Sequence, residues 1–254
     1  MKSIFFMKKI LIGFVIILFC SGLASCASKG RVEKNVLTDF NKEADFPNID
    51  PSAYVSPEAT VIGHVMIGKR VYLAPHSFVR GDEGQPLHVG DESNIQDSAG
   101  IHALEAEELH SGHWEQLDGR RFSANGKRLS SKESNDRTGY AVYIGKRVSI
   151  AHQSLVHGPA YVGDDTFIGM QSQIFNAKVG KNVAIGVKSL ITNGVSIPDD
   201  RYVPPGSVIT TQAQADALPP RVGSPYENTN KAVVHVNTSL ADGYNGKELK
   251  KSDH

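Results

Sequence analysis

The sequence lacks an excess of charge of either sign and is poor in cysteine and tryptophan. Its 254 residues include 27 Lys and Arg against 27 Asp and Glu. A surface that binds nucleic-acid phosphates needs an excess of Lys and Arg, so this balance argues against a nucleic-acid partner. The two cysteines are too few for a disulfide-stapled scaffold. With 40% hydrophobic and 21% charged residues, the chain is too apolar to be disordered and too charged for a polytopic membrane protein.

The chain does have a distinct N-terminal segment. Three lysines among the first nine residues precede an apolar run at 10–19. This run has the length of a signal-peptide hydrophobic region and is short for a membrane span of about 20 residues. The sequence Leu-Ala-Ser-Cys at 23–26 then resembles the lipobox of bacterial lipoproteins, in which Cys26 becomes the lipidated first residue. An ordinary signal peptide cleaved nearby, or a short membrane anchor, is the alternative.

We therefore expect residues 1–25 to be a lipoprotein signal peptide. Residues 26–46 are polar and charged, and we expect them to form a tether between the lipid and the folded domain. The lipid would be the only membrane contact of the chain. The protein would then be held in the cell envelope, on the extracytoplasmic side of a membrane.

An aliphatic residue recurs every six positions over most of the remaining chain. The series is interrupted after Val79 and again after Ile101, and one residue is dropped before Val179. Neither the 3.6-residue period of a helix nor the 2.0-residue period of a strand explains a strict six. The aliphatic positions are Val55, Val61, Ile67, Leu73, Val79, Val89, Ile95, Ile101, Ile144, Ile150, Val156, Val162, Ile168, Ile174, Val179, Ile185, Ile191, Ile197, Val203 and Ile209.

A unit of six residues fits one short strand plus one turn. Three units would close a triangular coil around the aliphatic side chains, with small or φ-permissive residues at the corners. Stacked coils would pair in parallel about 4.8 Å apart. The pattern resembles the left-handed parallel β-helix of hexapeptide-repeat proteins, and only the resemblance supplies the hand, which is an exception to the right-handed crossover rule. We expect an all-β fold with this β-helix over 47–211 and an insertion at 103–141.

Residues 212–254 leave the hexad pattern. Apolar residues recur there at helical spacing between 232 and 240. The spacing predicts an α-helix from about Tyr226 to Leu240, packed along the outside of the β-helix. A frayed tail is expected to follow from Gly243.

Two of the ten histidines occupy the same position of the repeat. His102 follows Ile101, and His157 follows Val156. If the insertion interrupts a single turn, the two are one coil apart, and their imidazoles stack on one face about 4.8 Å apart at the backbone. Two nitrogens on a tetrahedral metal lie roughly 3.3 Å apart, which side-chain tilt can supply.

His152 falls two places after Ile150, on a neighbouring face near a corner. One chain would then offer two ligands on one side and one on another. A cyclic homotrimer could place His152 of one subunit beside His102 and His157 of the next, giving three sites at three interfaces. From position alone, ordinary surface histidines are an equally good interpretation.

The residues around these histidines resemble the γ-class carbonic anhydrases. Arg-Gly-Asp-Glu-Gly at 80–84, Ile-His-Ala-Leu-Glu at 101–105 and Ala-His-Gln-Ser-Leu-Val-His-Gly-Pro at 151–159 occur in order. The similarity spans roughly residues 47–245 and is closest to the subgroup with an N-terminal signal and the acidic glutamates. It implies a homotrimer that reversibly hydrates CO₂ to bicarbonate and a proton.

The resemblance also implies a metal site. His102, His152 and His157 match the three ligands, with His152 donated across the trimer interface. The metal is Zn²⁺, or Fe²⁺, one per subunit, and imidazole suits either ion. Three neutral ligands leave the metal its full charge and an open position, where a bound water ionises near pH 7 and the hydroxide attacks CO₂.

Further polar residues match catalytic positions of the family. Glu105 matches the proton-shuttle glutamate and Glu83 a second carboxylate that assists proton movement. Without the resemblance, both are more simply interpreted as solvated loop acids. Gln96 matches the residue that hydrogen-bonds the metal-bound hydroxide, Asn94 a polar neighbour, and Asn237 the side chain that polarises bound CO₂.

Three charged residues match interface positions, and one residue departs from the pattern. Arg80 and Asp82 match an inter-subunit ion pair that supports trimerisation and bicarbonate binding, and Asp97 matches another interface acid. His235 stands where the closest family members carry a tyrosine, so we assign it no catalytic role. The long insertion could also reposition Glu105.

Two other functions fit the same fold. A hexapeptide acyltransferase uses one histidine as a general base and binds an acyl thioester between subunits, without three histidines in metal register. A non-catalytic scaffold that keeps the γ-class fold is the second. The intact ligands and both glutamates argue against a scaffold, whereas His235 and the enlarged insertion keep it open.

Overall fold

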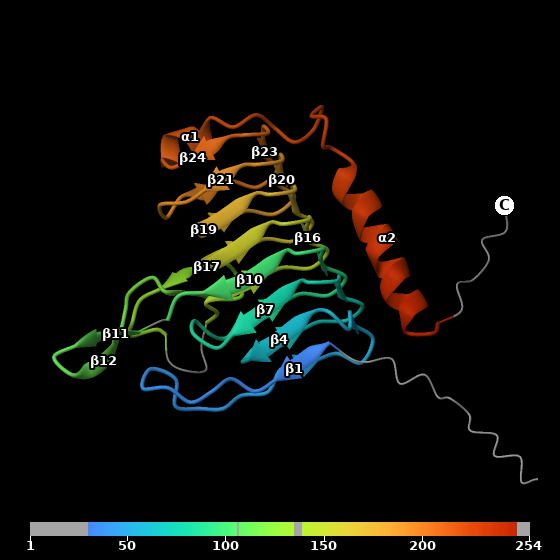
Figure 1. Cartoon of the computed structure of the whole chain (residues 1–254). Coiled ribbons are helices and arrows are strands. Elements are labelled where there is room, and N and C mark those ends of the chain that lie inside the picture. The colour runs from blue at the N-terminus through green and yellow to red at the C-terminus, as the bar shows by residue number, and fades with distance from the viewer. Residues whose placement is uncertain (1–29, 106, 135–138, 248–254) are drawn as a thin grey trace, which may run out of the picture.

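The computed structural model describes residues 30–105, 107–134 and 139–247. The signal peptide expected at 1–25 and the lipidated Cys26 therefore lie outside the described residues. Within these ranges, short parallel strands stack into a coil whose turns follow one axis (Figure 1). A 13-stranded sheet wraps around two faces of the coil and a 7-stranded sheet forms the third. The predicted hexapeptide β-helix is confirmed.

Each face of the coil is a ladder of parallel strands. The first face carries β1 (Arg31–Glu33), β4 (Thr60–Gly63), β7 (Phe78–Gly81), β10 (Gly100–Ala103), β17 (Leu155–Val162), β19 (Gln173–Val179), β21 (Leu190–Ile191) and β24 (Val208–Ile209). The second carries β2 (Asn48–Ile49), β5 (Val65–Ile67), β8 (Leu87–Val89), β15 (Val142–Ile144), the ends of β17 and β19, and β22 (Ser196–Ile197). The third carries β3 (Tyr54–Val55), β6 (Tyr72–Leu73), β9 (Asn94–Ile95), β16 (Ser149–Ile150), β18 (Phe167–Ile168), β20 (Ala184–Ile185) and β23 (Tyr202–Val203).

The aliphatic residue of each hexad points into the coil. From Val61 to Ile209, each of these side chains is at most 6% exposed, and Val55 in the first repeat is partly buried. Burying one such side chain stabilises the fold by about 1.5–3 kcal/mol. These stacked columns of Val, Ile and Leu therefore supply most of the core.

The glycines that follow many of these aliphatic residues do not form the left-handed corners. Positive φ falls instead on residues such as Arg147 (φ 53°) and Asp165 (φ 60°). Gly90 is required for space, because a Cβ there would lie 2.5 Å from the carbonyl oxygen of Gly145 in the next coil. The repeat glycine therefore permits close approach between coils, whereas the sequence analysis considered small residues only for the corners.

The insertion 103–141 interrupts a single coil, as predicted. Its described residues form two hairpins, β11 (Glu107–His110) with β12 (His113–Gln116) and β13 (Arg121–Phe122) with β14 (Arg128–Leu129). The second hairpin packs on the coil through the buried Phe122, whose ring centroid lies 6.1 Å from that of Tyr161. The coil then resumes with Ile144 in register with Val89.

The segment expected to be a polar tether, 26–46, belongs to the fold from residue 30 onward. β1 pairs in parallel with β4 and adds one strand to the first face. In the loop that follows, Asn41 is 3% exposed and exchanges two amide hydrogen bonds with Gln85. The tether prediction was therefore wrong for these residues, because strand pairing and a buried amide pair hold a segment that looks like a linker by composition.

Two helices follow the coil. The short α1 (Gln212–Asp216) covers its last turn, and α2 (Thr229–Tyr244) runs along the third face (Figure 1). α2 extends past the predicted end at Leu240 because Asp242 pairs with Arg70 at 2.8 Å and the Tyr244 ring stacks on Tyr54 at 4.7 Å. Neither helix in the described part of the chain has the length and hydrophobicity of a membrane-spanning helix.

Candidate metal centre

His102 and His157 lie side by side on the first face. They are direct partners in the pairing of β10 with β17, the placement that the repeat register predicts, and their ring centroids are 5.2 Å apart. His157 Nδ1 lies 3.0 Å from the Gly158 carbonyl oxygen. Because a carbonyl only accepts, Nδ1 carries the proton and Nε2 keeps its lone pair. Burial, opposed by the Gly158 contact and aided by His102, lowers the pKa of His157, which favours the neutral form that binds metals.

Two buried polar atoms beside this pair have no hydrogen-bond partner among the described residues. They are His102 Nε2 and Asp82 Oδ1, and they lie 3.6 Å apart. Glu83 Oε1 lies 3.7 Å from the same imidazole nitrogen. Buried polar atoms are nearly always satisfied. An unpaired imidazole nitrogen that faces carboxylates, next to a second imidazole, therefore fits a bound cation.

Arg80 and Asp82 pair within one chain. Arg80 Nη2 lies 2.9 Å and Nε 3.2 Å from Asp82 Oδ2. Burial alone would raise the pKa of Asp82, but the polar contact with His102, the hydrogen bonds from Arg80 and its charge outweigh burial and lower this pKa to about 2. The carboxylate therefore stays charged beside His102. Within one chain, Arg80 and Asp82 therefore already contact each other, and the ion pair between subunits stays a prediction.

His152 lies on a different side of the coil. Its side chain is 49% exposed, and its Nδ1 lies 3.0 Å from Asp97 Oδ2. His152 lines a cavity of about 390 Å³ together with Gln96 and, from α2, Asn237. Gln96 Nε2 donates to Asn94 Oδ1 at 2.9 Å, which fixes the orientation of the Gln96 amide. The structure thus brings these polar residues together around His152 and away from His102.

One chain therefore holds two incomplete halves of a site. Among the described residues, no three His, Cys, Asp or Glu side chains are grouped closely enough to hold a metal ion. The pair His102 and His157 belongs to one half, and His152 to the other. A site with three imidazoles requires a second copy of the chain.

Comparison with known proteins identifies the family. The chain is 48% identical over 215 residues to the carbonic anhydrase of Methanosarcina thermophila, an alignment covering 84% of this chain and 81% of that protein. The chain belongs to the γ-class carbonic anhydrase family. It is also 28% identical to the mitochondrial gamma carbonic anhydrase 2 of Arabidopsis thaliana, over 67% of this chain and 49% of that protein. A scan against protein-family models found no match.

Two further similarities extend beyond carbonic anhydrases. The chain is 38% identical to the carboxysome assembly protein CcmM of a Nostoc species, over 82% of this chain but only 33% of that longer protein. A solved hexapeptide transferase family protein from Anaplasma phagocytophilum matches with a TM-score of 0.55 at 21% identity, over 79% of this chain and 93% of that one. The second likeness shows the shared fold alone.

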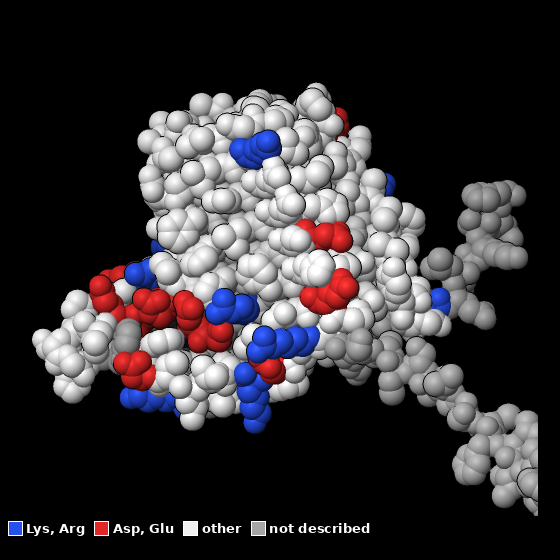
Figure 2. All heavy atoms as spheres, in the orientation of Figure 1, with Lys and Arg blue, Asp and Glu red and all other residues white. Residues whose placement is uncertain are grey.

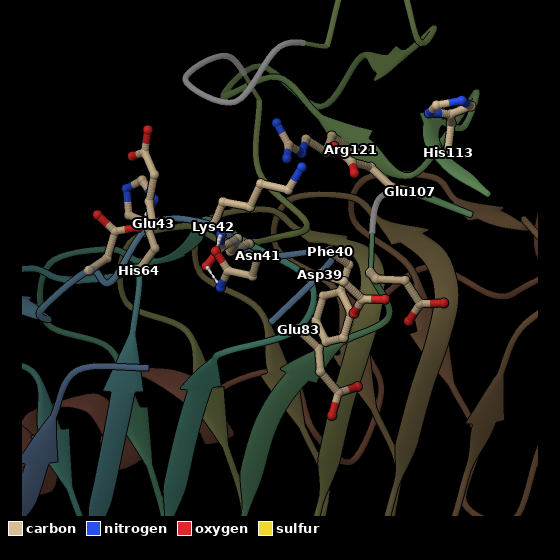
Figure 3. A pocket seen from close by; sticks show the side chains of 13 residues that line it. Asp39, Phe40, Asn41, Lys42, Glu43, His64, Glu83, Glu107, His113 and Arg121 are labelled. Atoms are coloured by element: carbon tan, nitrogen blue, oxygen red, sulfur yellow. Dashed lines mark hydrogen bonds and ion pairs between the residues drawn. The ribbon is translucent and has the colours of Figure 1, made fainter. Parts of the chain in front are cut away.

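In this carbonic anhydrase family member, a second cavity of about 420 Å³ opens beside Glu83 and Glu105 (Figure 3). Glu105 comes from the start of the insertion. The cavity is walled by residues that the sequence analysis did not single out: Asp39, Phe40, Asn41, Lys42, Glu43, Asp45, His64, Gln85, Glu107, His113 and Arg121. The N-terminal residues were missed because they were assigned to the tether. No local sequence motif indicates that this N-terminal segment packs beside Gln85.

Charge is unevenly distributed over the first face. Figure 2 shows acidic side chains gathered near the base of the β11–β12 hairpin and few charged residues over β17, β19 and β21. On β19, Phe175 is 40% exposed, and its ring centroid lies 5.3 Å from that of His157. An apolar, weakly charged surface beside the His102–His157 pair is typical of a surface that a protein partner covers.

His235 does not line the cavity that holds His152 and Asn237. It lines an adjoining cavity with Ser239 and Tyr244, and Val236 and Leu240 line both cavities. Its position in the structure therefore gives no reason to assign it a catalytic role.

Proposed function

We propose that this chain catalyses the reversible hydration of CO₂ to bicarbonate and a proton. The observation that carries the proposal is the pair His102 and His157, in which a buried, unsatisfied imidazole nitrogen faces Asp82. A bound cation would satisfy that nitrogen. The same residues lie in a chain that is 48% identical to a carbonic anhydrase.

One Zn²⁺ or Fe²⁺ per subunit is the cofactor that this donor set suits. His102 and His157 would hold it together with His152 of the partner subunit. When bound, such a cation lowers the pKa of a coordinated water, so that hydroxide is available near neutral pH. The chain prepares its ligands for this, because the Gly158 carbonyl fixes the tautomer of His157 and Asp97 orients His152.

The assembly we propose is a cyclic homotrimer. In a closed ring, one face of each copy meets a different face of the next. The His102 half and the His152 half lie on different faces of one chain, as this geometry requires. The exposed Phe175 beside His157 supports burial of that face against a neighbour.

Gln96 and Asn237 are suited to orient the reactants. Asn237 is 7% exposed, and its Nδ2 donates to the Val233 carbonyl at 2.8 Å. A side-chain amide has two N–H donors, so one holds the side chain on α2 and the other remains to polarise a CO₂ oxygen. Gln96, fixed by Asn94, would position the attacking oxygen.

Each hydration releases a proton, and Glu105 and Glu83 are placed to move it. Both carboxylates line the 420 Å³ cavity, and Glu83 also lies 3.7 Å from His102. A carboxylate that contacts the metal side and opens to solvent can pass a proton to buffer. The other acids around this cavity offer further acceptors.

We also propose that the chain is a lipoprotein, anchored at Cys26 on the extracytoplasmic side of a cell-envelope membrane. The support is the Leu-Ala-Ser-Cys sequence at 23–26, after a basic and then an apolar stretch. Mass spectrometry of the membrane-extracted protein tests this directly. A mature chain that begins at Cys26 with acyl groups supports the proposal, and any other N-terminus contradicts it.

The catalytic proposal is tested by CO₂ hydration assays on protein loaded with Zn²⁺ and, separately and without oxygen, with Fe²⁺. Metal content near one per subunit with hydration well above the buffer rate is the expected result. Metal content near zero with acyl transfer would favour the acyltransferase that shares this fold. Loaded protein without hydration activity would contradict the proposal.

A non-catalytic scaffold is the second candidate function. The similarity of this chain to the carboxysome assembly protein of Nostoc supports this candidate. A scaffold would keep the trimer and the metal but not the activity. Full metal content in a trimer with no hydration would therefore favour this function.

A further inference from the structure

The end of the β-helix that carries the N-terminus has an unusual surface. We propose that this end, and the loop at 34–46 in particular, lies against the lipid bilayer, so that the coil stands on the membrane and the lipid is not the only membrane contact, in contrast to the expectation from the sequence. The proposal rests on the lipidation of Cys26 proposed above and is independent of the catalytic assignment.

The length of chain before the fold limits how far this end can lie from a lipid at Cys26. Arg31 N–H donates to the Ala59 carbonyl at 2.9 Å, so the fold begins there. Gly30 is already packed, because a Cβ on it would lie 2.4 Å from the Ser56 carbonyl oxygen. Four residue steps separate Cys26 from Gly30, and a fully extended chain covers roughly 14 Å in that number. The first coil must therefore sit close to the bilayer surface.

The loop at 34–46 forms the outermost part of that end. It joins β1 to β2, and each of these is the terminal strand of its face (Figure 1). Asn35, which is 4% exposed, accepts a hydrogen bond from the Asp45 N–H at 2.8 Å and donates to the Glu43 carbonyl at 2.8 Å. These bonds join the two sides of the loop and hold it in a fixed shape.

Three large apolar side chains of this loop are exposed. Val36 is 72%, Leu37 64% and Phe46 58% exposed, and Lys34 beside them is also exposed. Exposed apolar groups gathered on a fixed loop mark a surface that something covers. Apolar side chains next to a lysine are typical of segments that lie in the lipid interface.

The acids of the same loop point to the cavity instead. Asp39, Glu43 and Asp45 line the cavity shared with Glu83, as Figure 3 shows for the first two, and Asp45 pairs with His64 at 3.5 Å. The exposed Val36, Leu37 and Phe46 do not line this cavity, whereas Phe40 and Lys42 of the same loop do. In a cyclic trimer, equivalent loops lie in one plane perpendicular to the axis, so all three can meet one flat bilayer.

The test uses the processed, lipidated chain in phosphatidylcholine–phosphatidylglycerol vesicles, with an environment-sensitive fluorophore on one introduced thiol. Signal cleavage removes Cys20, and the lipid blocks Cys26, so each variant has a single free thiol. Leu37→Cys labels the loop, and Val208→Cys labels β24 at the opposite end of the stack. We expect lipids with quenchers near the headgroup to remove most of the emission at position 37 and little at position 208.

A flexible Gly/Ser insertion between Lys29 and Gly30 is the matched control for tether length, and it should weaken quenching at position 37 without releasing the protein. Equal quenching at both positions, or none at position 37, in vesicle-bound lipidated protein would overturn the proposal. So would a label at position 37 that is already shielded from aqueous iodide without vesicles, because a second copy would then cover the loop. Mass spectrometry without lipid on Cys26 would overturn anchoring and orientation together, while CO₂ hydration would be unaffected.

Discussion

The group that contacts one nitrogen of an imidazole determines whether the other nitrogen can bind a metal. His157 Nδ1 donates a hydrogen bond to the Gly158 carbonyl, and His152 Nδ1 contacts the Asp97 carboxylate. In both residues Nε2 therefore remains available to bind a metal. His76, by contrast, is 69% exposed at the side chain, and its Nε2 lies 3.5 Å from a Glu58 carboxylate oxygen. This contrast makes His76 a suitable control for substitutions of the ligand histidines.

Replacing His152 should remove the metal without unfolding the chain. The half-exposed side chain of His152 lies outside the aliphatic core, so His152→Ala should change the free energy of unfolding of metal-free protein by only about 0.5 kcal/mol. Metal content and CO₂ hydration should both fall to background. Metal analysis, urea unfolding and the hydration assay measure these outcomes, with His76→Ala expected to match wild type in all three. Wild-type metal content in His152→Ala would exclude this residue as a ligand.

The amide pair of Asn41 and Gln85 should stabilise the wall of the cavity beside Glu83 and Glu105. Asn41→Ala leaves the Gln85 amide without its two hydrogen bonds, and this should cost about 1–3 kcal/mol in urea unfolding. The double variant Asn41→Gln with Gln85→Asn keeps both amides and their combined length, so it should recover much of the loss. A double variant as unstable as Asn41→Ala would show that the pair itself does not matter.

Single residues also show where the sequence was sufficient. The pairing of His102 with His157 follows from a strict six-residue period, because the aliphatic core fixes the register on both sides of the insertion. The pairing of Asn41 with Gln85 could not be predicted, since neither residue belongs to a repeat and 44 positions separate them.

Among the elements, α2 is held on the coil by stacked tyrosines. Tyr244 stacks on Tyr54, and Tyr54 on Tyr72 with ring centroids 5.6 Å apart. The spacing of apolar residues predicted that a helix would pack here, but its end depended on Asp242 and Tyr244, which contact residues far away in the chain. Helical periodicity gives the face of a helix more readily than its ends.

Alkaline pH should weaken this helix docking. Burial, with smaller contributions from the charges of Tyr244, Asp97 and Tyr54, raises the pKa of Tyr72 to about 12 from 10.0. The neutral phenol therefore contributes stability that is complete below pH 10 and is lost as the pH rises through about 12.

Tyr72→Phe keeps the stacked ring and cannot ionise. Between about pH 9 and pH 12, the free energy of unfolding should fall more steeply in wild type than in Tyr72→Phe, by up to about 2 kcal/mol. Urea unfolding at several pH values, at constant ionic strength, measures this difference. Parallel curves for the two proteins would show that ionisation of Tyr72 does not affect stability.

The whole molecule is a repeat coil whose candidate site is divided between faces. The fold and the position of each half could be predicted because a six-residue period determines which residues share a face. The folding of residues 30–46 could not be predicted, because this polar segment has no periodic pattern that would indicate the pairing of β1 with β4. The cavity beside Glu83 and Glu105 was missed for the same reason, since part of its wall comes from residues 39–45.

A metal site that forms only between two copies of the chain can be rebuilt from two variants that each lack a different half. The experiment co-expresses His152→Ala with His157→Ala and measures the hydration activity of the purified mixed trimers. Each variant alone should be inactive. In randomly mixed rings, about a quarter of the interfaces would combine an intact His102–His157 half with an intact His152 half, so about a quarter of wild-type activity should return. Mixed trimers that form and remain as inactive as either variant alone would contradict a site shared between subunits.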